Sequence, residues 1–148
     1  MVDRVELARN NFLKGYNCAQ AIAVAFHDLI GLTEEEAAKM ASPFGGGFGR
    51  MREVCGAVSG MTLVLGALEG NPDPSDQAAK TRIYEREREL LAKFQEAQGS
   101  IICRELLGLR KDTKESAAPS ERTTAYYQGR SCLSSIELAA RILEEYVI

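Results

Sequence analysis

Apolar residues recur at helical spacing through most of the chain. Near the N-terminus, Val5, Ala8 and Phe12 follow one another at intervals of three and four residues among charged side chains, which is typical of one buried helix face. Thr33 and Glu36 form a capping box, a signal for the start of a helix. With glycine and proline as breakers, the pattern predicts helices over residues 3–13, 18–31, 33–41, 54–69, 76–98, 101–107 and 131–146.

The predicted helix 54–69 differs from the others because it is apolar on nearly every side. Such a pattern is typical of a helix that is surrounded by others. Gly56, Ala57 and Gly60 are small residues that let a second backbone approach closely. No stretch alternates polar and apolar residues for long enough to predict a strand. The sequence therefore predicts an all-α fold: one domain, residues 1–148, with six or seven helices around the apolar helix 54–69.

The polar segment 111–130 separates the last two predicted helices. It contains Pro119 and lacks a periodic apolar pattern, so we predict a loop. Its tyrosines, Tyr126 and Tyr127, are candidates for covering a site.

Composition and charge narrow the classes of function. The chain has 148 residues, of which 45% are hydrophobic and 26% charged, and its net charge is −3. This charge gives no electrostatic basis for binding nucleic acid or an anionic membrane. The longest apolar run is too short to span a bilayer, and the charged N-terminus does not resemble a secretory signal, so we expect a cytoplasmic protein without membrane insertion. The long amphipathic helix that begins near Ser75 is compatible with a homo-oligomer.

The candidate chemistry comes from four cysteines, Cys18, Cys55, Cys103 and Cys132. In a cytoplasmic protein we expect reduced thiols, metal ligands or redox groups. No CxxC pair is present, which excludes a thioredoxin-type motif and a zinc knuckle. The chain has one histidine, His27, so a four-ligand metal site would have to combine cysteines from distant segments.

All four cysteines fall in the first turn of a predicted helix. Asn17 is a good N-cap directly before Cys18, and Cys132 follows its cap in the same way. The helix macrodipole favours negative charge there, which lowers the pKa of a thiol and equally suits a metal-bound thiolate. A buried cysteine can also be a small hydrophobic residue without chemistry.

A glycine-rich loop precedes Cys55. Gly45, Gly46 and Gly47, with Arg50, are candidate cofactor-binding residues that could cradle a phosphate, but the order GxxxxGK[ST] is absent and no strand precedes the loop. A tight turn that packs closely over Cys55 is the favoured interpretation. Arg50 and the neighbouring Arg52 could stabilise a thiolate at Cys55 or bind an anion.

These residues resemble the C_GCAxxG_C_C family of redox-active proteins. The match comprises CGAVSG at residues 55–60, GYNCAQA at 15–21, FGGG at 44–47, CRELLG at 103–108, and Cys132. The resemblance covers nearly the whole chain and includes all four cysteines. It implies a cytoplasmic redox or metal-related role, linked to an oxidoreductase or transport system as partner, without naming a reaction.

Three hypotheses follow for the function. In the first, Cys55 is an attacking thiolate and Cys18 resolves the mixed disulfide. In the second, Cys18, Cys55, Cys103 and Cys132 together hold an iron–sulfur cluster or a zinc ion in an electron-transfer or binding module. In the third, the chain is a helical interaction module whose cysteines only pack.

Overall fold

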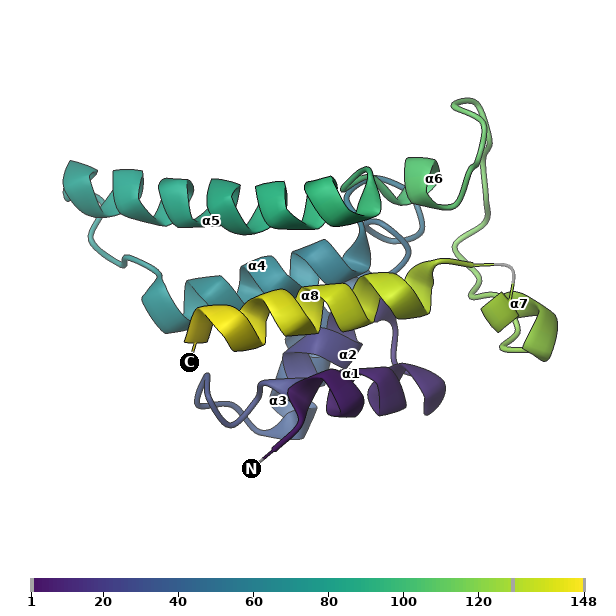
Figure 1. Ribbon diagram of the computed structural model, residues 1–148, viewed down its shortest axis with the longest axis horizontal. Coiled ribbons are helices and arrows are strands. Elements are labelled where there is room, and N and C mark those ends of the chain that lie inside the picture. Colours follow the sequence, from purple (N-terminus) through teal and green to yellow (C-terminus); the bar gives the residue numbers. More distant parts are fainter. Residues whose placement is uncertain (1, 129, 148) are drawn as a thin grey trace.

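Helices form all the regular structure in residues 2–128 and 130–147, the part of the chain that the computed structural model describes (Figure 1). The all-α prediction is therefore confirmed. The elements are α1 (Arg4–Leu13), α2 (Cys18–Ala25), α3 (Glu34–Ala41), the 3₁₀ turn η1 (Ser42–Phe44), α4 (Gly56–Glu69), α5 (Gln77–Gln98), α6 (Cys103–Leu106), α7 (Thr124–Gln128) and α8 (Cys132–Val147).

Side chains at the helix starts explain why these boundaries lie where they do. The Asn17 side chain accepts a hydrogen bond from the Gln20 N–H, and the Gln20 side chain accepts one from the Asn17 N–H. Thr33 and Glu36 form the same reciprocal pair at the start of α3, as the sequence predicts. Each box satisfies two N–H groups that a helix start would otherwise leave without a partner.

Helix α2 is shorter than the sequence predicts, because it ends at Ala25 instead of continuing to residue 31. The guanidinium of Arg4 donates to the Ala25 carbonyl oxygen (2.8 Å) and to the Asp28 carboxylate (2.7 Å). These bonds satisfy a carbonyl at the end of the helix and hold the following residues in turns. The contact comes from α1, so the local pattern could not reveal it.

The prediction that segment 111–130 is entirely a loop was also wrong, because α7 lies within it. The Thr123 hydroxyl accepts a hydrogen bond from the Tyr126 N–H (3.1 Å) at the start of this short helix. The rings of Tyr126 and Tyr127 then pack against Phe12 of α1, with centroids 6.4 and 5.9 Å away. Tertiary aromatic contacts therefore stabilise a helix too short to be stable alone.

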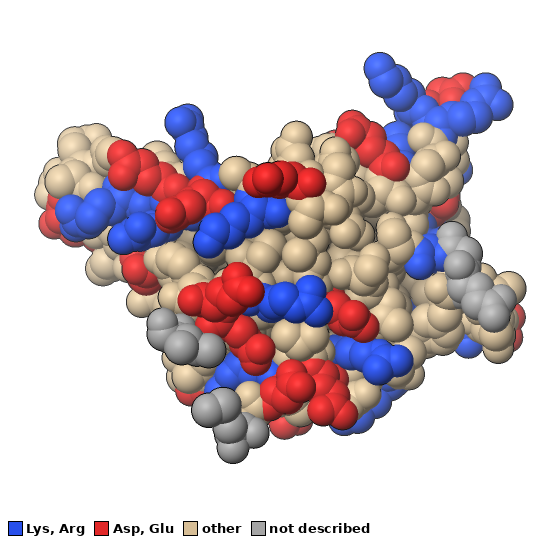
Figure 2. All heavy atoms as spheres, viewed as in Figure 1, with Lys and Arg blue, Asp and Glu red and all other residues tan. Residues whose placement is uncertain are grey.

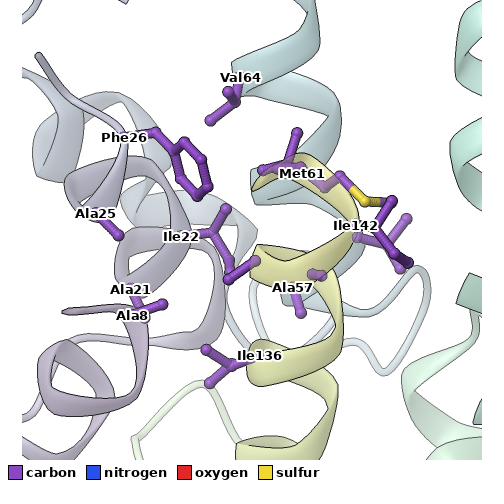
Figure 3. Packing of buried hydrophobic residues seen from close by; sticks show 14 of the residues in the cluster. Ala8, Ala21, Ile22, Ala25, Phe26, Ala57, Met61, Val64, Ile136 and Ile142 are labelled. Carbon is purple, nitrogen blue, oxygen red and sulfur yellow. The ribbon is translucent and has the colours of Figure 1, made fainter. Parts of the chain in front are cut away.

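The main hydrophobic core lies where α2, α4 and α8 pack against one another, with α1 and α5 outside them. Figure 3 shows Ile22 of α2, Met61 of α4 and Ile136 of α8 reaching into this region. All three are fully buried. In Figure 1 the N-terminal ends of α4 and α8 lie at one end of the molecule, beside α6 and α7. The core therefore aligns the starts of helices that carry cysteines.

Two glycines of α4 permit its close approach to α2. A Cβ atom at Gly56 would lie 2.8 Å from the Cβ of Cys18, and one at Gly60 would lie 2.8 Å from the Ala19 carbonyl oxygen and the Ile22 Cβ. No unstrained contact is that short. The small residues at this spacing therefore bring α2, and Cys18 with it, against the start of α4.

We expect Gly60→Ala to lower the free energy of unfolding by about 1–3 kcal/mol, since the added methyl group overpacks the contact between α2 and α4. Gly66→Ala is the matched control in the same helix, because a Cβ there meets nothing within 4 Å. It should raise the free energy of unfolding by about 0.5–1 kcal/mol through helix propensity. Urea denaturation of both variants checks this. A neutral or stabilising Gly60→Ala would contradict the close packing.

The surface carries charges of both signs. On the face shown in Figure 2, blue and red side chains alternate over α5, where Arg86 and Glu89 form an ion pair (3.5 Å). Such a mixed face favours solvation over attraction of a polyanion. None of the described helices combines the length and the apolar character that crossing a membrane requires.

Candidate functional site

A short antiparallel pairing places Cys55 beside Cys103. Val54 and Ile102 form an isolated β-bridge. On either side of it, the Cys55 N–H donates to the Ile101 carbonyl oxygen (2.7 Å) and the Cys103 N–H donates to the Glu53 carbonyl oxygen (2.6 Å). The segment before α4 and the segment before α6 are thereby fixed to each other by their backbones.

The glycine-rich loop before this pairing is wound in the left-handed conformation. The five residues from Gly46 to Arg50 have φ between 59 and 76°, and Arg52 has φ 62°. This conformation is unfavourable for Phe48, Arg50 and Arg52, by about 1–3 kcal/mol each. It places Gly47 so close to Cys103 that a Cβ atom would lie 2.8 Å from the cysteine Cβ. The loop therefore packs tightly against Cys103.

All four cysteines line one cavity of about 60 Å³, which we call the cysteine cavity. Cys18, Cys103 and Cys132 are the first residues of α2, α6 and α8, and Cys55 is the N-cap of α4, so the predicted placement at helix starts is confirmed. Cys55 and Cys103 are buried, whereas Cys18 and Cys132 are partly exposed, and all four are free thiols. The fold thus brings together four sulfurs from distant segments.

Cys18 and Cys132 both line this cavity, and interaction between the two thiols shifts the pKa of each. Hydrogen bonding from Cys18 lowers the pKa of Cys132 to about 7, and Arg130, Arg52 and Arg122 lower it too, while burial opposes them. The same hydrogen bond, together with burial, raises the pKa of Cys18 well above its ordinary value. Cys132 is thus the more acidic thiol of the pair, and Cys18 the less acidic one.

The pKa values of Cys55 and Cys103 are raised, whereas that of Cys132 is lowered. Burial raises the pKa of Cys55 to about 12, although the N–H groups of Ala57 and Val58 lower it. Burial also raises the pKa of Cys103, despite its contact with Arg52. The helix start therefore acts on Cys55 as the sequence predicts, but the loss of water outweighs it. Both cysteines are neutral thiols near pH 7.

Arg52 connects the glycine-rich loop to the cysteine cavity. It is 4% exposed, and its guanidinium donates to the Glu115 carboxylate (Nε–Oε2 2.9 Å) and to the Cys103 sulfur (3.6 Å). Arg50 donates to the same carboxylate oxygen (2.9 Å) and to the Ser120 hydroxyl. Although partial burial opposes them, these two arginines lower the pKa of the Glu115 carboxyl. The loop is thereby tied to segment 111–130.

One wall of the site was not predicted from the sequence as a group. It consists of Arg122, Tyr126 and Arg130. Arg122 donates to the carbonyl oxygens of Phe12 (2.9 Å) and Tyr16 (3.0 Å) and lies 4.2 Å from the Phe12 ring centroid. Arg130 lies 4.5 Å from the ring centroid of Tyr126. The only signals in the sequence are two arginines and two tyrosines in a polar segment just before Cys132.

The predicted anion-binding residues of the loop lie around a second cavity. Gly45, Gly46 and Arg50 line a space of about 270 Å³ next to the cysteine cavity. Gly47 is not among its lining residues and packs against Cys103 instead. The loop thus contributes both to close packing and to a hollow with basic side chains.

A metal centre would need several ligand atoms around one point. Within residues 2–128 and 130–147, no three His, Cys, Asp or Glu side chains are arranged to hold a metal ion. His27 lies outside both cavities, with its Nδ1 2.9 Å from the Leu32 carbonyl oxygen. The four cysteines therefore line one cavity, but they are not arranged as a set of metal ligands.

Comparison with known proteins connects this site to one family. A family model described as "Putative redox-active protein (C_GCAxxG_C_C)" matches residues 16–146, a span that contains all four cysteines. No curated protein and no solved structure matches the chain.

Proposed function

The chain belongs to the C_GCAxxG_C_C family of redox-active proteins, and on that premise we propose that it performs thiol–disulfide exchange with Cys132 and Cys18 as the reacting pair. The observation that carries the proposal is that these two cysteines line the same cavity and are both partly exposed, whereas Cys55 and Cys103 are buried; each of the two thiols also shifts the pKa of the other. Exchange requires one thiolate and a second thiol within reach of it, and this pair supplies both.

The proposed reaction proceeds in two steps. The Cys132 thiolate attacks one sulfur of a disulfide R–S–S–R, forms a mixed disulfide and releases RS⁻. Cys18 then loses its proton and attacks the Cys132 sulfur, which forms the Cys18–Cys132 disulfide and releases the second RS⁻. The two cysteines are oxidised and the substrate disulfide is reduced to two RS⁻ groups. Because Cys132 enters as the thiolate, the one proton released is that of Cys18, and it ends on a released RS⁻ or in water.

This assignment changes the role that the sequence predicts for Cys55. Its thiol is 6% exposed, and burial holds its pKa near 12, which disfavours the thiolate that would attack. We propose that Cys55 and Cys103 instead remain neutral thiols, more deeply buried than the reacting pair. Cys18 keeps the resolving role that the sequence suggests.

A reducing compartment is the natural place for such a pair. We propose the cytoplasm, where reductants keep thiols reduced until an oxidised substrate arrives. A dithiol oxidoreductase is the proposed partner that returns the disulfide to two thiols. The four free cysteines of the chain are compatible with this cycle.

The test is to oxidise the reduced protein with one equivalent of a small disulfide, block the remaining thiols by alkylation and map the bonds by mass spectrometry. We expect a single Cys18–Cys132 disulfide. It should persist in Cys55→Ser and be absent from Cys132→Ser, while Cys18→Ser should stop at the mixed disulfide.

Two results would overturn the proposal. One is a dominant disulfide that includes Cys55 or Cys103 in the wild-type protein. The other is stoichiometric iron or zinc, held by the four cysteines, after anaerobic purification; that would favour the electron-transfer module instead. Anaerobic metal analysis with a visible spectrum therefore accompanies the mapping.

A further inference from the structure

Among the residues that the structure describes, four arginines and no acidic residue line the second cavity beside the cysteines. Arg50, Arg52, Arg122 and Arg130 border about 270 Å³ of space, and we call it the arginine cavity. Ser42, Ser120 and Asn17 add polar groups to its wall. The volume is close to the lower limit for small-molecule sites. Its lining is suited to a small anion.

The charge of this cavity is only partly compensated. One carboxylate, that of Glu115, serves both Arg50 and Arg52. Arg122 binds neutral carbonyl oxygens, and within residues 2–128 and 130–147 no ion pair joins Arg122 or Arg130 to a carboxylate. The cavity therefore keeps an excess of positive charge that an anionic ligand can neutralise.

These arginines are also held in place before any ligand binds. The guanidinium of Arg122 makes two hydrogen bonds to carbonyl oxygens and lies 5.2 Å from the Tyr126 ring centroid as well as over Phe12. Arg130 lies over the same tyrosine at 4.5 Å. Fixed side chains lose little entropy on binding a ligand, and guanidinium groups match carboxylates in geometry.

The arginine cavity adjoins the reacting thiols. It shares six lining residues with the cysteine cavity: Asn17, Gly46, Arg52, Arg122, Tyr126 and Arg130. Asn17 directly precedes Cys18, and Arg130 lies two residues before Cys132. The cysteine cavity, at about 60 Å³, has room only for a small group. A bound molecule can thus occupy the larger hollow and extend a sulfur into the smaller one.

From this arrangement we propose that the arginine cavity binds the carboxylates of an acidic low-molecular-weight disulfide and presents its S–S bond to Cys132. The proposal rests on the thiol–disulfide exchange proposed above and names its substrate class. The reaction is the balanced exchange already described, with R carrying a carboxylate. The alternative that the experiment tests is an exchange reaction that does not distinguish the charge of the disulfide.

The experiment compares three disulfides of similar size and different charge. They are 3,3′-dithiodipropionate, which is a dianion, 2-hydroxyethyl disulfide, which is neutral, and cystamine, which is a dication. Second-order rate constants for oxidation of the reduced protein are divided by those for reduced dithiothreitol, which removes the intrinsic reactivity of each disulfide. We expect the normalised dianion-to-dication ratio to be about tenfold or more at low salt and to fall as salt rises.

Substitutions at the arginine cavity test whether its arginines cause the preference for the dianion. Arg130→Gln should lower the dianion-to-dication ratio about threefold, while Arg130→Lys, which keeps the charge, should largely restore it. Arg88→Gln makes the same charge change at an exposed position of α5 and should leave the ratio unaltered. Because both disulfides react with the same thiolate, the ratio is independent of any change in the pKa of Cys132.

The two proposals fail in different ways. Normalised rates that are equal for the three disulfides, or an equal ratio in Arg130→Gln and wild type, would overturn the acidic substrate and leave the exchange reaction standing. If none of the three forms the Cys18–Cys132 disulfide, the exchange reaction itself fails. A normalised preference for the dianion that Arg130→Gln reduces supports both.

Discussion

In the reduced protein, Cys132 is expected to react with an alkylating reagent at pH 7 about a hundredfold faster than Cys55. Only thiolates react at a useful rate. With a pKa of about 7, roughly half of Cys132 is ionised at that pH, whereas Cys55, with a pKa of about 12, is about 10⁻⁵ ionised. The less basic thiolate is intrinsically a weaker nucleophile, by a factor of a few hundred over this difference in pKa. The greater thiolate fraction outweighs this loss.

The pH dependence of alkylation checks the same assignment. In the wild-type protein, the rate with iodoacetamide should fall about tenfold per pH unit below 6 and level off above 8, because the thiolate fraction follows the pKa of Cys132. Cys18→Ala removes the hydrogen bond that lowers this pKa, so the midpoint should move upward. Cys55→Ser is the matched control and should keep the wild-type profile. A fast phase that survives in Cys132→Ser and disappears in Cys55→Ser would restore the hypothesis that Cys55 attacks.

Much of the fold could be predicted because the signals for it are local. Asn17 with Gln20, and Thr33 with Glu36, are three residues apart, and each pair fixes a helix start on its own. The premature end of α2 could not be predicted in this way. It depends on a hydrogen bond from Arg4, twenty-one residues before Ala25, whose carbonyl oxygen accepts it.

The candidate site shows the same division between local and distant causes. That each cysteine stands at a helix start is a local property, and the sequence predicts it correctly. Which thiol is ionised depends on burial and on the partner sulfur, both set by packing. At Cys55 the N–H groups of α4 favour the thiolate, but burial raises the pKa further than they lower it. Helix position alone therefore does not determine which thiol is ionised.

The arginine cavity could not be read from the sequence, because its four arginines come from two separate segments. Arg50 and Arg52 belong to the glycine-rich loop, whereas Arg122 and Arg130 lie in the segment predicted as a loop. Contacts of Arg122 with the carbonyl oxygens of Phe12 and Tyr16 hold that segment against α1. Only the folded chain places the four side chains around one space.

Replacing Arg52 by alanine is expected to lower the free energy of unfolding by about 2–3 kcal/mol. Arg52 is 4% exposed and donates from Nε and from Nη2 to the Glu115 carboxylate, whose side chain is 20% exposed. Removal of one partner from a buried ion pair leaves the other charge without compensation, which typically costs about 3–5 kcal/mol. The loss is smaller here because Arg50 still contacts the carboxylate.

Arg50→Ala is the matched control for this prediction. Both arginines have nearly the same left-handed φ, 65° and 62°, and both bind Glu115, so backbone effects of the substitution are similar. Arg50 is more exposed, at 17% of its side chain against 5%, and bonds the carboxylate through one nitrogen, so we expect a loss of about 1 kcal/mol. Urea denaturation followed by circular dichroism measures both losses. Equal losses would contradict the role assigned to the burial of Arg52.

The pH dependence of stability gives an independent check on this ion pair. The pKa of Glu115 is lowered in the folded protein, so the carboxylate stabilises the fold above its unfolded pKa, about 4.3, and this contribution is lost as the pH falls through the folded pKa. Arg52→Ala should therefore destabilise the protein more at pH 7 than at pH 3, which lies below the unfolded pKa, so that part of this contribution is already lost. A loss that is the same at both pH values would mean that Arg52 stabilises the loop by packing and not through the charge of Glu115.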